Sequence, residues 1–142
     1  MVSRPSAGVL FAVAAVLVAT RVGGAQPKTA VPYTRAQAVV GAKEYEANCS
    51  ACHGARLEGG AGPALTGAKF ALRAKRTQMT VGDLFANVAQ RMPLNEPASL
   101  THAQYVAIGA YLLMKNGYAP ATTPLTYGAA MKSGVSMGAR EK

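Results

Sequence analysis

Three stretches of the chain place apolar or small residues at three- and four-residue steps, which is the spacing of an amphipathic helix. The first stretch follows Thr34 and carries Ala38, Gly41, Ala42, Tyr45 and Cys49. A second helix is expected after Thr80. The third stretch carries Tyr105, Ile108 and Leu112, runs from His102 to about Lys115, and stops at the Asn-Gly pair that follows. No stretch alternates with period two, so the pattern predicts an all-α fold.

Each predicted helix begins at the same kind of signal. The sequences "TRAQ", "TVGD" and "THAQ" begin at Thr34, Thr80 and Thr101, and each places a polar side chain three residues after the threonine. The first and third match the capping box, in which the threonine oxygen and the later side chain satisfy free N–H groups of the first turn. The second is a looser version of it.

The first 25 residues have the layout of a secretory signal peptide. Arg4 precedes an apolar run from Gly8 to Ala19, and small residues at Gly23 and Ala25 form a cleavage site before Gln26. The alternative is an uncleaved anchor, but the run is shorter than the roughly 20 residues of a spanning helix. The sequence therefore predicts an exported, periplasmic protein that does not span the membrane after cleavage.

The rest of the chain divides into three segments. Residues 26–33 contain two prolines and are expected to form an extended lead-in, residues 34–117 a single domain, and residues 118–142 a flexible tail without regular pattern. Within the domain, Gly54–Gly67 ("GARLEGGAGPALTG") is too rich in glycine for regular structure. Its glycines suggest a backbone that turns tightly or passes close to something bulky.

Positive charge dominates the chain. Lys and Arg outnumber Asp and Glu by 15 to 6, which gives a formal net charge of +9. The basic residues are spread along the sequence and aromatic residues are few, so a nucleic-acid partner is not expected. The charge favours partners with acidic docking surfaces.

Both cysteines lie in "NCSACHG", residues 48–54. On a helical turn Cys49, Cys52 and His53 point toward the same side, and Cys-x-x-Cys-His is the attachment pattern of c-type haem. A thioredoxin-like redox pair would require a neighbouring strand, and a structural zinc site would require four protein ligands, whereas the chain has only one further His and no further Cys. A disulfide would leave a core poor in large residues unexplained, so one haem c, covalently attached through both cysteines, is the favoured interpretation.

His53 is then the first axial ligand of the iron, and the second ligand decides what the haem can do. Met92 is the best candidate, because the Met-Pro pair lies in the connection between the second and third helices and Pro93 keeps Met92 out of helical geometry. The other candidates are Met79, Met114, Met131, Met137 and His102. The metal ligands are thus predicted to be His53 and Met92.

Over residues 34–117 these features resemble the small class I cytochromes c. The resemblance implies a cytochrome c fold in which three main helices pack around one covalently attached haem. It also implies that Gly41 and Tyr45 of the first helix pack against Ile108 and Tyr111 of the last, and that Gly62-Pro63 accepts a hydrogen bond from His53. More narrowly, the chain is similar to cytochrome subunits of quinoprotein alcohol dehydrogenases. It lacks the Trp that many relatives place at a haem propionate; Arg73, Lys75 or Arg76 are the candidates to pair with a propionate instead, and the alternative is that they are solvated surface charges.

The expected function is that of a periplasmic one-electron carrier, not an enzyme in its own right. It would take electrons from a substrate dehydrogenase and pass them to an oxidase or another cytochrome in a respiratory chain. Two alternatives stay open. In the first, the chain would be a permanently bound haem subunit of a dehydrogenase complex. In the second, it would be a haem enzyme or gas sensor whose iron lacks a second protein ligand.

Overall fold

The computed structural model describes Met1 and residues 31–138, so the predicted signal peptide, apart from Met1, and most of the lead-in lie outside the described residues. This part of the chain contains six helices and no β-strand, and one isolated bridge joins Thr80 to Ser136. The helices are α1 (Arg35–Asn48), α2 (Ser50–His53), α3 (Gly67–Arg76), α4 (Val81–Arg91), α5 (His102–Lys115) and α6 (Tyr127–Met131). The all-α prediction is confirmed. None of these helices is long and apolar enough to cross a bilayer.

All three predicted helix starts are confirmed. Thr34, Thr80 and Thr101 are the N-caps of α1, α4 and α5, and each forms a complete capping box with the residue three positions later. The second box is as complete as the others, because the Asp83 carboxylate accepts a hydrogen bond from the Thr80 backbone N–H at 2.9 Å. That bond, with one from the Thr80 hydroxyl, lowers the pKa of Asp83.

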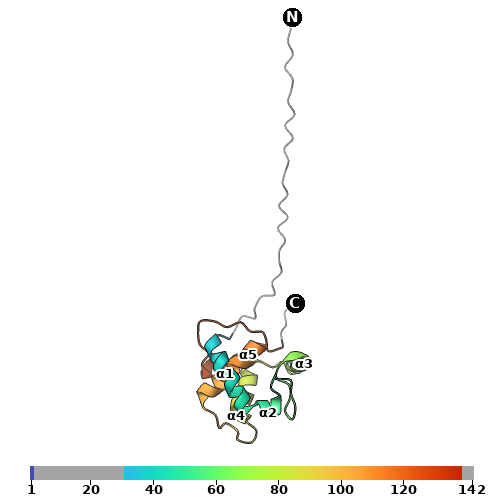
Figure 1. Cartoon of the computed structure of the whole chain (residues 1–142). Helices are drawn as coiled ribbons and strands as arrows, with labels where there is room; N and C mark the ends of the chain where they lie inside the picture. The colour runs from blue at the N-terminus through green and yellow to red at the C-terminus, as the bar shows by residue number, and fades with distance from the viewer. Residues whose placement is uncertain (2–30, 139–142) are drawn as a thin grey trace.

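The helices α1 and α5 cross at very close range (Figure 1). A Cβ added to Gly41 would lie 1.8 Å from the carbonyl oxygen of Ala107, so only glycine permits the contact. One turn further along α1, the rings of Tyr45 and Tyr111 pack with their centroids 5.5 Å apart. The contact that the family resemblance implies, between the first and the third of the helices predicted from the sequence, is therefore present between α1 and α5.

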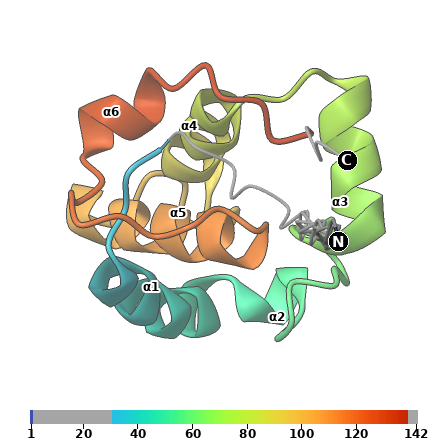
Figure 2. The ribbon, with the colours of Figure 1, turned by 90° about the horizontal axis from the view of Figure 1, so that it is seen from above.

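The helix α3 differs from the expectation of three main helices, because its residues received no helix in the sequence-based prediction. Phe70 and Ala74, one turn apart, are fully buried and form the inner face of this helix. Among the described helices, α3 is the one that makes no close backbone contact with another helix. Figure 2 shows α3 at the edge of the molecule, away from α1, α5 and α6. Loops hold it in place instead.

The segment after α5 also corrects the sequence-based expectation, which was a flexible tail. Tyr118, Leu125, Ala130 and Met137 are buried, and the segment packs over α4 and α5 through α6. Its end is fixed by backbone hydrogen bonds on both sides of Thr80, from Val81 N–H to Val135 O and from Met137 N–H to Met79 O. These few buried side chains, widely spaced in a polar stretch, produce no periodic signal in the sequence, and residues 139–142 lie outside the described part.

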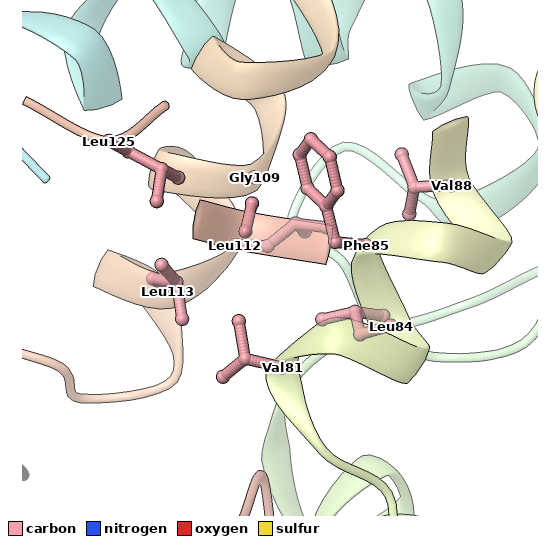
Figure 3. A pocket seen from close by; sticks show the side chains of 9 residues that line it. Val81, Leu84, Phe85, Val88, Gly109, Leu112, Leu113 and Leu125 are labelled. Atoms are coloured by element: carbon pink, nitrogen blue, oxygen red, sulfur yellow. The ribbon is translucent and has the colours of Figure 1, made fainter. Parts of the chain in front are cut away.

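A small cavity lies where α4, α5 and this C-terminal segment meet (Figure 3). Leu125 closes one side of it and Phe85 projects toward Gly109 on the other. All nine residues around it are apolar or glycine. The cavity therefore offers no polar side chain to a substrate, and it belongs to the packing of the C-terminal segment.

Candidate functional site

The Cys-x-x-Cys-His motif forms a separate helical turn. The helix α1 ends one residue before Cys49, whose φ of −131° breaks the helix, and α2 starts at Ser50. The backbone N–H groups of Cys52 and His53 both donate to the carbonyl of Cys49, so the three side chains share one turn. Neither cysteine forms a disulfide.

The environment of Cys49 does not suit thiol redox chemistry. Its side chain packs against the hydrophobic core, and burial, together with the neighbouring Cys52, raises the pKa of the Cys49 thiol to about 11. Thiol–disulfide enzymes depend on a lowered thiol pKa, because the thiolate is the nucleophile. The structure thus argues against the redox-pair alternative for this motif.

The glycine-rich loop folds back on the motif. Gly59 N–H donates to His53 O and Gly62 N–H to Cys52 O, each at 2.8 Å. A Cβ on Gly62 would lie 2.8 Å from Cε1 of the His53 ring, so the bulky group that the glycine accommodates is the imidazole. Leu57, fully buried, anchors the middle of the loop.

His53 has one ring nitrogen committed and one free. Its Nδ1 lies 2.8 Å from the carbonyl oxygen of Pro63, and because a carbonyl only accepts, Nδ1 carries the proton. The other nitrogen, Nε2, then bears the lone pair, and it has no hydrogen-bond partner among the described residues. This is the arrangement by which a protein orients a metal-ligating histidine.

Met92 lies on a different segment, as the C-cap of α4, with extended backbone angles and a cis peptide bond to Pro93. The side chain is half-buried. The backbone carbonyl of Met92 accepts a hydrogen bond from the hydroxyl of Tyr105 on α5 at 2.7 Å. The residue therefore occupies the connection between α4 and α5, where the sequence placed it.

The other candidate iron ligands have different surroundings. His102 stacks on the ring of Tyr127, with 3.8 Å between the centroids, so it helps to dock α6. Met137 is buried in the C-terminal segment, and the three remaining methionines pack partly buried against the core: Met79, Met114 and Met131. Among the described residues, no three His, Cys, Asp or Glu side chains come together as a metal cluster.

Three further contacts around the site were not foreseen from the sequence. Tyr45 OH donates to Gly54 O at 2.6 Å, directly after the motif, and burial raises the pKa of that hydroxyl. Arg73 Nη2 donates to Ala64 O at 2.8 Å, so the residue considered for a propionate also secures the loop after Pro63. Tyr105 is the third. In the sequence analysis, Tyr45 and Tyr105 counted only as apolar positions of the helical pattern. Such a pattern contains no information about the hydrogen-bond partner of a tyrosine hydroxyl.

A comparison with protein families gives a match for most of this region. The model of the family described as cytochrome c oxidase, cbb3-type, subunit III matches residues 36–112, which span the motif, the loop, Met92 and most of α5. The chain belongs to this family. No curated protein and no solved structure matches it.

Membership makes the chain a class I c-type cytochrome, and its domain implies haem c and an electron-transfer role with redox partner proteins. The donor set agrees with such a cofactor. Two free thiols and an imidazole with a free Nε2 share one helical turn, and Gly62 leaves room for the ring. These residues of the cytochrome fit the group.

Proposed function

We propose that this cytochrome is a one-electron carrier that binds one haem c covalently through Cys49 and Cys52 and ligates its iron with His53 and Met92. The observation that carries the proposal is the hydrogen bond between His53 Nδ1 and Pro63 O. This bond leaves the lone pair of Nε2 available to a metal, on the same helical turn as two free thiols. When bound, haem c supplies an iron that takes up and releases one electron.

Each protein group has a defined task in this proposal. Cys49 and Cys52 anchor the group, Pro63 fixes the imidazole tautomer and raises its basicity, and Gly62 lets the loop pass over the ring. The thioether of Met92 would be the second protein ligand of the iron, where it would hinder the binding of exogenous ligands and favour a higher reduction potential than a second nitrogen would. The protein then needs only to hold both ligands and keep water out.

An absorption spectrum of the purified protein in both redox states tests the cofactor and its ligation together. We expect the sharp bands of a six-coordinate c-type haem after reduction, the near-infrared band of Met ligation after oxidation, and a haem that stays with the polypeptide after denaturation. Rapid binding of carbon monoxide by the reduced wild-type protein would instead identify an open-site haem enzyme or gas sensor.

We also propose that the carrier works in the periplasm. The support is the amino-terminal sequence, with its basic residue, apolar run and small residues before Gln26. Amino-terminal sequencing of the protein recovered from a periplasmic extract tests the proposal, with Gln26 as the expected first residue. A protein that begins at Met1 and stays with the membrane fraction would contradict it.

The proposed redox partners carry acidic surfaces, and α3 is the part of the cytochrome that suits them best. All four charged residues of α3 are basic: Lys69, Arg73, Lys75 and Arg76. The ion pair present in the described part of the chain joins Arg56 to Glu58, so α3 keeps its charge unpaired. Leu72, 56% exposed between these cations, adds an apolar contact.

Electron transfer to an acidic blue-copper protein is therefore expected to slow as salt is raised, because salt screens the attraction between exposed charges. The triple variant Lys69→Gln, Lys75→Gln, Arg76→Gln should lower the second-order rate at low ionic strength by about tenfold and flatten its salt dependence. Stopped-flow kinetics over a range of ionic strength measures both effects.

A matched control removes the same charge elsewhere. Arg35→Gln, Lys43→Gln and Lys132→Gln lie on or next to α1 and α6, and all three side chains are exposed. This variant should retain most of the wild-type rate. Equal losses in the two triple variants would mean that net charge, and not α3, governs the encounter.

A second candidate function is a permanently bound haem subunit of a larger oxidoreductase. The name of the matched family describes an oxidase subunit, which favours this alternative. The resemblance to cytochrome subunits of quinoprotein alcohol dehydrogenases also favours a bound subunit, but with a dehydrogenase as the catalytic chain. Purification of the tagged protein from its native host distinguishes the two. A stoichiometric catalytic chain supports the subunit, and a soluble monomer supports the diffusing carrier.

A further inference from the structure

The hydroxyl of Tyr105 forms a hydrogen bond near each end of the connection between α4 and α5. Its side chain is 2% exposed, and its hydroxyl donates to Met92 O at 2.7 Å and accepts from Leu100 N–H at 3.3 Å. Between these two residues the chain is mostly exposed, and its own hydrogen bonds are short-range turns from Glu96 N–H to Pro93 O and from Ser99 N–H to Glu96 O. One buried hydroxyl thus joins the first residue of the connection, Met92, and its last residue but one, Leu100, to α5.

The hydroxyl is not needed for the position of Tyr105 in the fold. The ring occupies a buried position on the apolar face of α5 that continues with Ile108 and Leu112, and such a position is normally filled by an aliphatic or plain aromatic side chain. The hydroxyl adds two hydrogen bonds to a segment that has little buried surface of its own. A buried donor and acceptor satisfied in this way stabilise one conformation of the segment over its alternatives.

We propose that Tyr105 is a positioning residue that holds Met92 in place as an axial ligand and so controls how readily another ligand replaces it. The inference rests on the proposed function, because it requires Met92 to be a ligand. The hydroxyl acts on the backbone carbonyl of Met92 and not on the thioether, so it restrains the segment without altering the donor atom. Tyr105→Phe should therefore leave Met ligation intact at equilibrium but make it easier to displace.

Imidazole binding to the oxidised haem protein measures this displacement. Imidazole competes with the Met92 thioether for the sixth position, so its apparent affinity reports the stability of the closed connection. Loss of the Tyr105 hydrogen bonds should raise the affinity of the Tyr105→Phe variant for imidazole by about fivefold to tenfold. In the absence of imidazole the near-infrared band should be unchanged.

Tyr33→Phe is the matched control. Tyr33 is fully buried, and its hydroxyl also donates to a backbone carbonyl, that of Tyr118. Because Tyr118 lies just beyond the opposite end of α5, which continues for ten residues after Tyr105, this bond is about 15 Å along the helix from Tyr105. The control should lower the melting temperature as a lost buried hydrogen bond does, yet bind imidazole with wild-type affinity.

The outcomes separate the inference from the proposed function. Imidazole affinities that match among wild type, Tyr105→Phe and Tyr33→Phe, with the near-infrared band present, would overturn the inference alone. A wild-type protein without that band would overturn the Met92 assignment and the inference with it.

Amide hydrogen exchange in the wild-type protein tests the same contact without a variant. The N–H of Leu100 should exchange at least about tenfold more slowly than that of Ala98, which has no hydrogen-bond partner among the described residues. Equal exchange rates would show that the hydrogen bond from Leu100 N–H to the Tyr105 hydroxyl does not persist in solution.

Discussion

Replacing Met92 by alanine should open the sixth position of the iron. The variant is expected to lose the near-infrared band in its oxidised form and to bind carbon monoxide in its reduced form, because His53 alone leaves the iron accessible. The backbone bond from Tyr105 to Met92 O does not involve the side chain, so the connection should keep its place. Absorption spectra of both redox states, with and without carbon monoxide, measure the change.

Met131→Ala is the control for this prediction. Met131 is half-buried on α6, which packs on α4 and α5, and it was one of the alternative ligands. Its replacement should leave both spectra unchanged. If Met92→Ala kept the band and Met131→Ala lost it, the ligand assignment would be wrong, and the C-terminal segment would hold the ligand.

Replacing Gly41 by valine should strongly destabilise the cytochrome. Even the first carbon of a side chain would lie 1.8 Å from Ala107 O and 2.4 Å from Ala107 C, and because both atoms belong to the backbone of α5, no side-chain rotation relieves the clash. The two helices must separate, which disturbs the adjacent packing of Tyr45 on Tyr111. We expect a loss of about 3 kcal/mol or more in the free energy of unfolding.

Thermal unfolding followed by circular dichroism measures this effect, and the melting temperature should fall by more than about 10 °C for a domain of this size. Gly128→Ala is the control, because a Cβ at Gly128 meets nothing within 4 Å and its φ is not left-handed. That variant should be neutral or slightly stabilising. A melting temperature for Gly41→Val close to that of the control would mean that α1 and α5 do not cross as described.

Local signals in the sequence predicted the parts of the fold that local chemistry decides. Each threonine at a helix start has its hydrogen-bonding partner three residues away, so Thr34, Thr80 and Thr101 could be read without knowledge of the fold. The end of α5 at Lys115 was likewise predictable from Asn116 and Gly117, and Gly117 adopts a left-handed φ of 85°. Such features involve neighbours in the chain.

The elements that were missed depend on distant partners. The inner face of α3 consists of Phe70 and Ala74, too few residues to stand out in a stretch dominated by basic side chains. The C-terminal segment contributes only scattered apolar residues, and Leu125 becomes part of the core because α4 and α5 present an apolar surface to it. A periodic pattern does not form when a segment is held by a few long-range contacts.

The sequence by itself determined the all-α class, the three main helix starts and the grouping of Cys49, Cys52 and His53 on one turn, because these follow from residue type and short spacing. Only the tertiary structure decided which nitrogen of His53 is free, that Gly62 makes room for its ring, and that Tyr105 fastens Met92. Each of these is a contact between groups nine or more residues apart. Such contacts arise from how the helices cross, which no local pattern encodes.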